Sequence, residues 1–185
     1  MAMAYDTALN KAWEELTQLK LKENVPVKFL ADEYSVDLEN RKVLSLSCNV
    51  PAKDFTVILI LHYLIKRLNG LPDLTGEWLD FKELSGIEGY NSAFRKRVIE
   101  PIIRKYAANP EGLLAILDRF PSKRVDQADI GIVIEVFEQV AAMVLFWRPD
   151  EEFGAEANLL FDKSIAQIFC TEDIVVLAES IARQL

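Results

Sequence analysis

The sequence predicts an α+β fold, in which a single domain over residues 1–185 packs an antiparallel sheet of short strands with about five or six helices. Near both ends of the chain, apolar residues recur every three or four positions, which is the period of a helix. Between them, alternating or continuous runs rich in Val, Ile and Phe indicate strands. A chain of 185 residues that is 51% hydrophobic can fill one core, and no break in composition indicates a second domain.

The first third of the chain predicts a helix, a pair of strands and a second helix. Asp6 or Thr7 suits the cap of the first helix. The stretch "YSVDLENRKVLSLSCNV" predicts two short strands around the turn "LENR". Pro51 suits the first turn of the second helix, which Asn69 and Gly70 close. The apolar stripe of the first helix consists of Tyr5, Leu9, Ala12, Trp13, Leu16 and Leu19.

The second helix is apolar almost all round from Val57 to Ile65, so we expect it to be the central buried helix. It carries His62, the one histidine of the chain. A lone histidine in such a helix is more often a hydrogen-bonded core residue than a catalytic base. Without GxSxG or HExxH, neither a histidine-based hydrolase nor a histidine-based zinc site is predicted.

The middle of the chain begins with a Gly-, Pro- and Asp-rich segment, in which Trp78 to Phe81 form a short strand candidate packed by its own aromatic side chains. A helix follows from Asn91. Pro101 removes a backbone donor from it, so we expect a kink or a restart there. Asn109 and Pro110 then suit the cap and first residue of another helix, which ends near residues 120–121.

The last third predicts three strands followed by helices. The runs "DIGIVIEVF" and "AAMVLFWR" are dense in strand formers and are separated by "EQ", and "EANLLFD" is a further strand candidate. Residues 163–169 and 171–185 return to helical spacing, with Thr171 as the expected cap. We find neither a repeat nor a GxGxxG or GxxxxGK phosphate loop, so the sequence predicts no cofactor.

The net charge of −8 is unevenly distributed: residues 1–81 carry −3, residues 82–124 carry +4 and residues 125–185 carry −9. This balance argues against double-stranded nucleic acid as the main ligand. The basic stretch "FRKRVIEPIIRKY" could meet an anion or an acidic partner, although the solvated face of a helix explains it more simply. No apolar run is long enough for a membrane span, and no secretory signal is visible. We therefore expect a cytoplasmic protein in which Cys48 and Cys170 are buried, reduced thiols.

The stretch "RPDEEFGAEANLLFD" holds the acidic residues that most invite a functional interpretation. Adjacent residues of a turn point in different directions, so Asp150, Glu151 and Glu152 need help from elsewhere to hold one ion. Asp162 could give that help if the strand returns antiparallel. In the structural alternative, which we favour, Asp150 bonds backbone amides in a turn, Asp162 caps the next helix and the glutamates are solvated.

Two long stretches resemble a bacterial and archaeal family, domain of unknown function 3786. Residues 146–177 are similar to its carboxy-terminal signature of W, DEEFPP, LFD, S and TED, and residues 60–94 to its middle signature. The resemblance spans about Phe29 to Leu177. The chain departs from the pattern at Gly154, where the family usually has proline, and near residues 139–142. The matching residues are Trp78, Phe81, Tyr90, Phe94, Trp147, Asp150, Glu151, Glu152, Phe153, Phe161, Asp162, Glu172 and Asp173.

The resemblance implies no assigned activity. It implies a setting in anaerobes, near or fused to iron-sulfur and corrinoid-protein modules, so a corrinoid or iron-sulfur protein is a candidate partner. This chain has no cysteine cluster for an iron-sulfur centre of its own.

Two hypotheses from different classes follow. The preferred one is a non-catalytic cytoplasmic binding or accessory module in anaerobic metabolism, with no catalytic residue assigned. The alternative is a carboxylate-based enzyme, divalent-metal-dependent or not, that uses the acids of 150–162. The sequence leaves open whether the acidic residues bind a metal ion and whether the protein forms a homodimer. The candidate ligand or partner site consists of Asp150, Glu151, Glu152, Asp162, Trp147, Trp78 and Tyr90.

Overall fold

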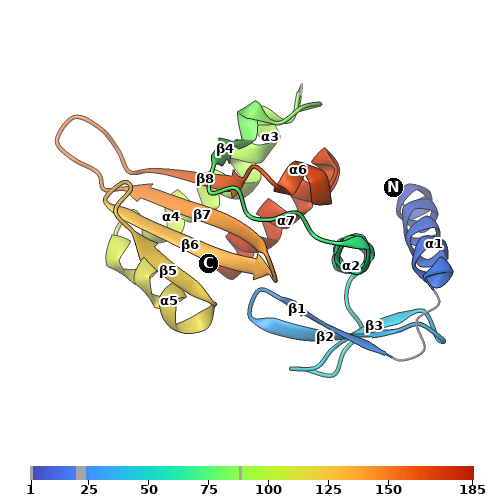
Figure 1. Ribbon diagram of the computed structural model, residues 1–185. Coiled ribbons are helices and arrows are strands. Elements are labelled where there is room, and N and C mark those ends of the chain that lie inside the picture. The colour runs from blue at the N-terminus through green and yellow to red at the C-terminus, as the bar shows by residue number, and fades with distance from the viewer. Residues whose placement is uncertain (1, 20–23, 88) are drawn as a thin grey trace. The chain divides into compact units, whose positions relative to one another are not determined.

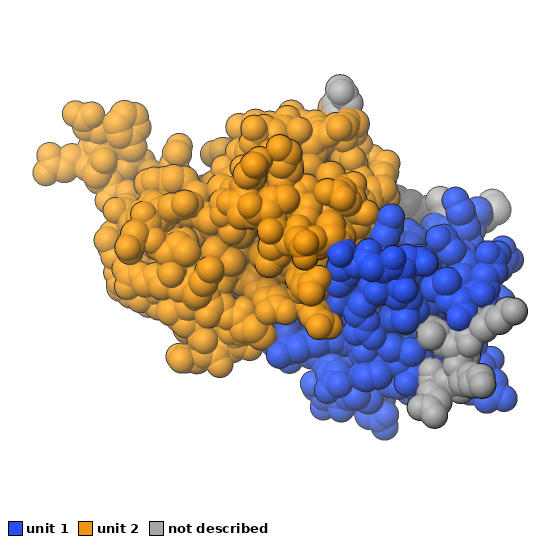
Figure 2. Space-filling view, in the orientation of Figure 1, with its two compact units in different colours: residues 1–71 blue, residues 72–185 orange. Residues whose placement is uncertain are grey.

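The computed structural model describes residues 2–19, 24–87 and 89–185, with the side chains of residues 2–5 outside that description. The predicted core position of Tyr5 therefore lies outside the described side chains. The fold is α+β, as predicted, with antiparallel pairing in both of its sheets (Figure 1). By their internal contacts, the residues form two compact units, 1–71 and 72–185 (Figure 2).

Unit 1 combines a three-stranded sheet, in the order β1-β2-β3, with two helices that pack against each other. Its elements are α1 (Ala2–Gln18), β1 (Val25–Phe29), β2 (Asp32–Asp37), β3 (Lys42–Ser45) and α2 (Asp54–Asn69). The predicted strand pair is confirmed, because Asp37 faces Lys42 across the turn. Strand β1 was not predicted; it is an edge strand, where Pro26 removes no donor from the centre of the sheet.

The helix positions in unit 1 confirm most of the predicted pattern and correct two start points. Trp13 and Leu16 are buried in α1, and α2 buries eight residues between Val57 and Ile65. Because α1 begins at Ala2, neither Asp6 nor Thr7 is its cap. Helix α2 begins at Asp54 rather than near Pro51, because the backbone before it still makes sheet-type bonds, such as Ala52 N to Val43 O at 2.8 Å.

Unit 2 contains a five-stranded antiparallel sheet in the order β4-β8-β7-β6-β5. The three predicted strands are confirmed as β6 to β8, and β5 is an unpredicted polar edge strand. The strands are β4 (Trp78–Asp80), β5 (Ser122–Val125), β6 (Ile130–Phe137), β7 (Val140–Trp147) and β8 (Glu156–Asp162).

The helical elements of unit 2 cover one face of this sheet, where Ile132, Val144 and Phe161 are fully buried. Segments η2, η3 and α4 contact strands β8 and β6, and α7 packs on η2 and α4. The bounds are η1 (Phe81–Glu83), α3 (Asn91–Phe94), η2 (Arg95–Ile99), α4 (Glu100–Tyr106), η3 (Pro110–Ala115), α5 (Ile116–Arg119), α6 (Ile165–Ile168) and α7 (Thr171–Gln184).

Two predicted caps in unit 2 are wrong, those at Asp162 and Thr171. Ser164 occupies the cap position of α6, whereas Asp162 lies two residues earlier at the end of β8. Thr171 is the first residue of α7, and its hydroxyl donates to Ser85 O at 2.7 Å instead of capping the helix. Asn109 occupies the cap position directly before Pro110, as predicted, but its side chain makes no cap bond. Among the described residues, no helix combines the length and the apolar character that a membrane crossing requires.

Both cysteines were predicted to be buried, and this is wrong: Cys48 and Cys170 are free and exposed. Cys48 follows β3 in a turn, and Cys170 lies in the connection that starts α7, so both occupy surface segments. Partial burial raises the pKa of Cys170 to about 11, so its thiol stays protonated at neutral pH.

Candidate functional site

The acidic triplet lies on the loop 148–155, which connects β7 to β8 and extends away from the sheet (Figure 1). Asp150 organises this loop: its carboxylate accepts the backbone N–H of Phe153 at 2.7 Å and of Glu152 at 2.8 Å. The backbone N–H of Asp150 in turn donates to Phe153 O at 2.9 Å. The bonds from Phe153 and Glu152 lower the pKa of Asp150, and the predicted turn is confirmed.

The base of the 148–155 loop is held by Arg148. Its backbone N–H donates to Asp129 Oδ2 at 2.8 Å, and its guanidinium pairs with Glu111. The tip presents Phe153, of which 69% is exposed, beside the exposed Glu151 and Glu152. The loop is therefore locally ordered and carries an aromatic side chain that the described residues leave in solvent.

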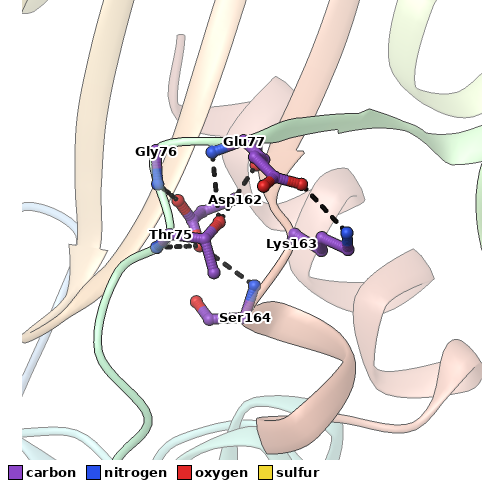
Figure 3. A network of polar contacts seen from close by, with 6 residues as sticks. All are labelled: Thr75, Gly76, Glu77, Asp162, Lys163 and Ser164. Carbon is purple, nitrogen blue, oxygen red and sulfur yellow. Dashed lines mark hydrogen bonds and ion pairs between the residues drawn. The ribbon is translucent and has the colours of Figure 1, made fainter.

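Asp162 is placed in the opposite environment, because its side chain is only 2% exposed. It accepts the backbone N–H groups of Gly76 at 2.8 Å, Ser164 at 3.0 Å and Thr75 at 3.1 Å, and the Thr75 hydroxyl at 3.1 Å (Figure 3). Next to this carboxylate network, Lys163 Nζ pairs with Glu77 at 2.9 Å. Burial alone would raise the pKa of Asp162, but the hydrogen bonds outweigh it and lower the pKa below its ordinary value.

The structure does not bring the four predicted acids together. Asp150 precedes β8 and Asp162 ends it, so a strand of seven residues, about 20 Å long, separates them. The returning strand carries Asp162 away from the loop instead of toward it. Within residues 2–19, 24–87 and 89–185, no group of three or more His, Cys, Asp and Glu side chains is arranged to hold a metal ion.

The three aromatic residues of the predicted site lie in different places. Trp78 is half-buried and packs on the apolar cluster of Val133, Ala141, Met143 and Leu145. Tyr90 immediately precedes α3 and is 37% exposed. Trp147, at the base of the 148–155 loop, is 39% exposed and lines a cleft.

The cleft has a volume of about 550 Å³ and lies within unit 2, between the β4–β8 edge of the sheet and the helical run 91–100. Its walls carry aromatic rings, cations, carboxylates and carboxamides. Pro101, within the basic stretch of residues 94–106, is the one signal of this cleft in the sequence, whereas the charges of that stretch by themselves indicate the solvated face of a helix. The lining residues are Asp80, Phe81, Lys82, Asn91, Ser92, Phe94, Arg95, Lys96, Ile99, Glu100, Trp147, Glu156, Ala157 and Asn158.

Comparison with protein families gives a match over residues 12–184 to the family described as domain of unknown function DUF3786. The chain belongs to this family. The match spans both compact units, so the DUF3786 region includes the 148–155 loop, the carboxylate network and the cleft. No curated protein and no solved structure shows a significant match to the chain.

Proposed function

We propose that the protein is a non-catalytic binding module that docks on a partner protein through the 148–155 loop. The observation that carries this proposal is Phe153, which is 69% exposed at the tip of a loop that Asp150 and Arg148 hold in place. An isolated exposed phenylalanine on a mobile loop would mean little. Here the backbone bonds fix its position before any partner arrives, which reduces the entropy lost on binding.

The surroundings of Phe153 define the chemistry of the partner. Asp150, Glu151 and Glu152 give the loop a negative tip, and residues 125–185 as a whole carry −9. An aromatic anchor inside an acidic rim fits an apolar recess bordered by lysine or arginine. The apolar contact supplies most of the affinity, and the acids speed the encounter.

The partner that we propose is a corrinoid or iron-sulfur protein of anaerobic metabolism, and we propose that the two proteins bind in the cytoplasm. The resemblance to domain of unknown function 3786 supplies this choice, and the free thiols of Cys48 and Cys170 fit a reducing compartment. A second copy of the chain is the other occupant to test, because the basic residues 95–97 are a candidate counterpart for the acidic tip.

The positions of the acids support a binding role over the carboxylate enzyme. A metal-assisted or paired acid–base mechanism needs carboxylates that converge on one reacting atom. The carboxylate oxygens of Asp150 and Asp162 instead accept hydrogen bonds from backbone N–H groups at opposite ends of β8. Glu151 and Glu152 are exposed on the loop.

The test compares Phe153→Ser with the matched variant Leu46→Ser, which removes an apolar side chain that is 54% exposed in unit 1. We expect wild type and Leu46→Ser to recover the same protein from an anaerobic lysate, and Phe153→Ser to lose it. With the purified partner, calorimetry should show that Phe153→Ser weakens binding by about tenfold or more. Equal recovery by all three chains, or no reproducible partner, contradicts the proposal.

Charge and self-association provide two further readouts. The double variant Glu151→Gln/Glu152→Gln should slow association at low salt and converge with wild type at high salt. Analytical ultracentrifugation tests the homodimer. If wild type dimerises and Phe153→Ser does not, the partner is a second copy and the corrinoid or iron-sulfur partner is rejected.

A further inference from the structure

The cleft in unit 2 is a second candidate for ligand binding, and it does not depend on the 148–155 loop having a partner. Its volume of about 550 Å³ falls inside the usual range for small-molecule sites, about 300–1,000 Å³. The residues that form it come from sequence positions as far apart as Asp80 and Asn158. Strand pairing between β4 and β8 brings these two together, and Asn158 Nδ2 donates to Asp80 Oδ2 at 2.8 Å.

One wall of the cleft is an irregular helical turn. Between Arg95 and Ile99 the chain forms a π-helix, and Glu100 N donates to Arg95 O, five residues earlier. Pro101 explains the irregularity, because it has no N–H for the carbonyl four residues before it. Widened turns of this kind occur often at functional sites. Here the turn contributes Arg95, Lys96 and Ile99 to the cleft.

The charges of the cleft are divided between two sets of elements. Lys82, Arg95 and Lys96 belong to the helical segments η1 and η2, which with Glu100 of α4 contribute three cations and one acid to the cleft, whereas Asp80 and Glu156 belong to strands β4 and β8. Arg95 meets Glu100 only loosely, at 3.9 Å. Among the residues that the structure describes, neither Lys82 nor Lys96 forms an ion pair, so both ammonium groups are available for a ligand.

Flat aromatic surfaces complete the cleft. The rings of Phe81 and Phe94 stack with their centroids 3.9 Å apart and their planes 7° apart, and both are buried, so they form the apolar base of the cleft rather than a surface open to a ligand. Trp147 stands at the cleft with 39% of its surface exposed. An exposed indole beside polar groups is a suitable stacking partner for a planar ring.

We propose that this cleft binds a mononucleotide, that is, a planar base with N–H donors joined through a sugar to a phosphate. The base stacks on Trp147 and offers its N–H groups to Glu156 and to the lone pairs of Asp80 that remain beside its bonds from Lys82 N and Asn158 Nδ2. The phosphate lies against the cations of the helical wall, Lys82, Arg95 and Lys96. A compact inorganic anion would use only the cations and an uncharged aromatic only the rings, whereas a nucleotide uses both and the carboxylates as well.

The first experiment is calorimetry of the full chain with AMP, GMP, CMP and UMP. We expect a saturable one-to-one isotherm for at least one of the three nucleotides whose base carries an amino group, and binding of UMP that is about tenfold weaker, because uracil has no amino group for the carboxylates. The nucleoside without phosphate and ribose 5-phosphate without base should each bind at least about tenfold more weakly than the nucleotide. No binding by any of the four nucleotides, or equal binding of ribose 5-phosphate, overturns the proposal.

Variants then locate the bound nucleotide. Lys82→Gln/Lys96→Gln should weaken binding by about tenfold or more, whereas Arg104→Gln/Arg124→Gln, which removes the same charge from exposed positions outside the cleft, should change it by less than about twofold. Trp147→Ala should also weaken binding by about tenfold. Equal losses in the two charge variants would mean general attraction and would reject the site. Phe153→Ser leaves the cleft residues in place, so the nucleotide result stands or falls separately from the partner result.

Discussion

The 148–155 loop and the carboxylate network around Asp162 are two regions of one acidic motif, and they use the same functional group in different ways. Asp150 is exposed and bonds N–H groups two and three residues ahead of it. Asp162 is buried and bonds N–H groups 86 and 87 positions behind it, besides that of Ser164. The first carboxylate shapes a local turn, and the second joins the ends of two strands.

Two acids of one sequence motif can therefore have different structural roles. Breaking the network leaves buried N–H groups without an acceptor, whereas breaking the turn returns exposed N–H groups to water. Stability should therefore depend strongly on Asp162, and the presentation of Phe153 should depend on Asp150.

The largest effect is expected from Asp162→Ala. The substitution removes the acceptor of three backbone N–H groups at a site that is 2% exposed, so unfolding free energy should fall by about 3 kcal/mol. Urea denaturation followed by circular dichroism measures the loss. A decrease of less than about 1 kcal/mol would mean that water replaces the carboxylate, and the network would not be the structural tie that we describe.

Two glycines, one in the sheet and one in the 148–155 loop, test the contrast between a packed region and an open region without changing any charge. A Cβ on Gly131 in β6 would collide with Gln127 O and lie 2.9 Å from Val125 O, so Gly131→Ala should cost about 2 kcal/mol. A Cβ on Gly154 in the loop meets nothing within 4 Å, so Gly154→Ala should leave stability unchanged or slightly raised. Thermal melts of the two variants measure the difference. Equal melting temperatures would contradict the rigid sheet and the open loop.

Acid should selectively remove the contribution of Asp162. The pKa of Asp162 is lowered in the folded state, so its stabilising effect is complete above the unfolded-state pKa of about 3.9 and is lost as the pH falls through the folded-state value. The stability gap between wild type and Asp162→Asn should thus be wide at pH 7 and narrow below about pH 4. Urea midpoints over this range test the trend, with Glu151→Gln as an exposed control. A gap independent of pH would contradict it.

The smallest effect on stability is expected from Asp150→Ala. Its backbone bonds lie in solvent, so the melting temperature should shift by no more than about 2 °C. The loop itself should loosen, which amide hydrogen exchange at Glu152 and Phe153 would show as a loss of protection. Unchanged protection would mean that Arg148 alone orders the loop.

Local features of the fold could be predicted from the sequence. The strand formers around "EQ" identified the β6–β7 hairpin, and the turn at Asp150 followed from its position after proline. Both features are formed by segments that are neighbours in the sequence: the hairpin turns between Phe137 and Val140, and the carboxylate of Asp150 bonds residues two and three positions ahead. For Asp162, a helix cap was predicted, whereas the structure has a local bond from Ser164 N in the turn between β8 and α6, and Ser164 itself occupies the cap position.

Features that depend on distant residues could not be predicted. The bonds from Thr75 and Gly76 to Asp162 require β4 to pair with β8, and the residue pattern of neither strand predicts which strand it pairs with. The cleft depends on the same pairing and on the π-helix before Pro101. The edge strands β1 and β5 were missed because one contains proline and the other is polar, so neither shows the apolar pattern of a central strand.

The pairing of β4 with β8 has a consequence for synthesis on the ribosome. Strands β5 to β8 follow one another along the chain, so each can pair with the strand synthesised just before it. Strand β4, in contrast, leaves the ribosome long before its partner β8. Strand β4, from Trp78 to Asp80, therefore stays unpaired until more than 70 further residues have been translated. A chain that stalls before β8 exposes this unpaired strand to aggregation or to chaperones.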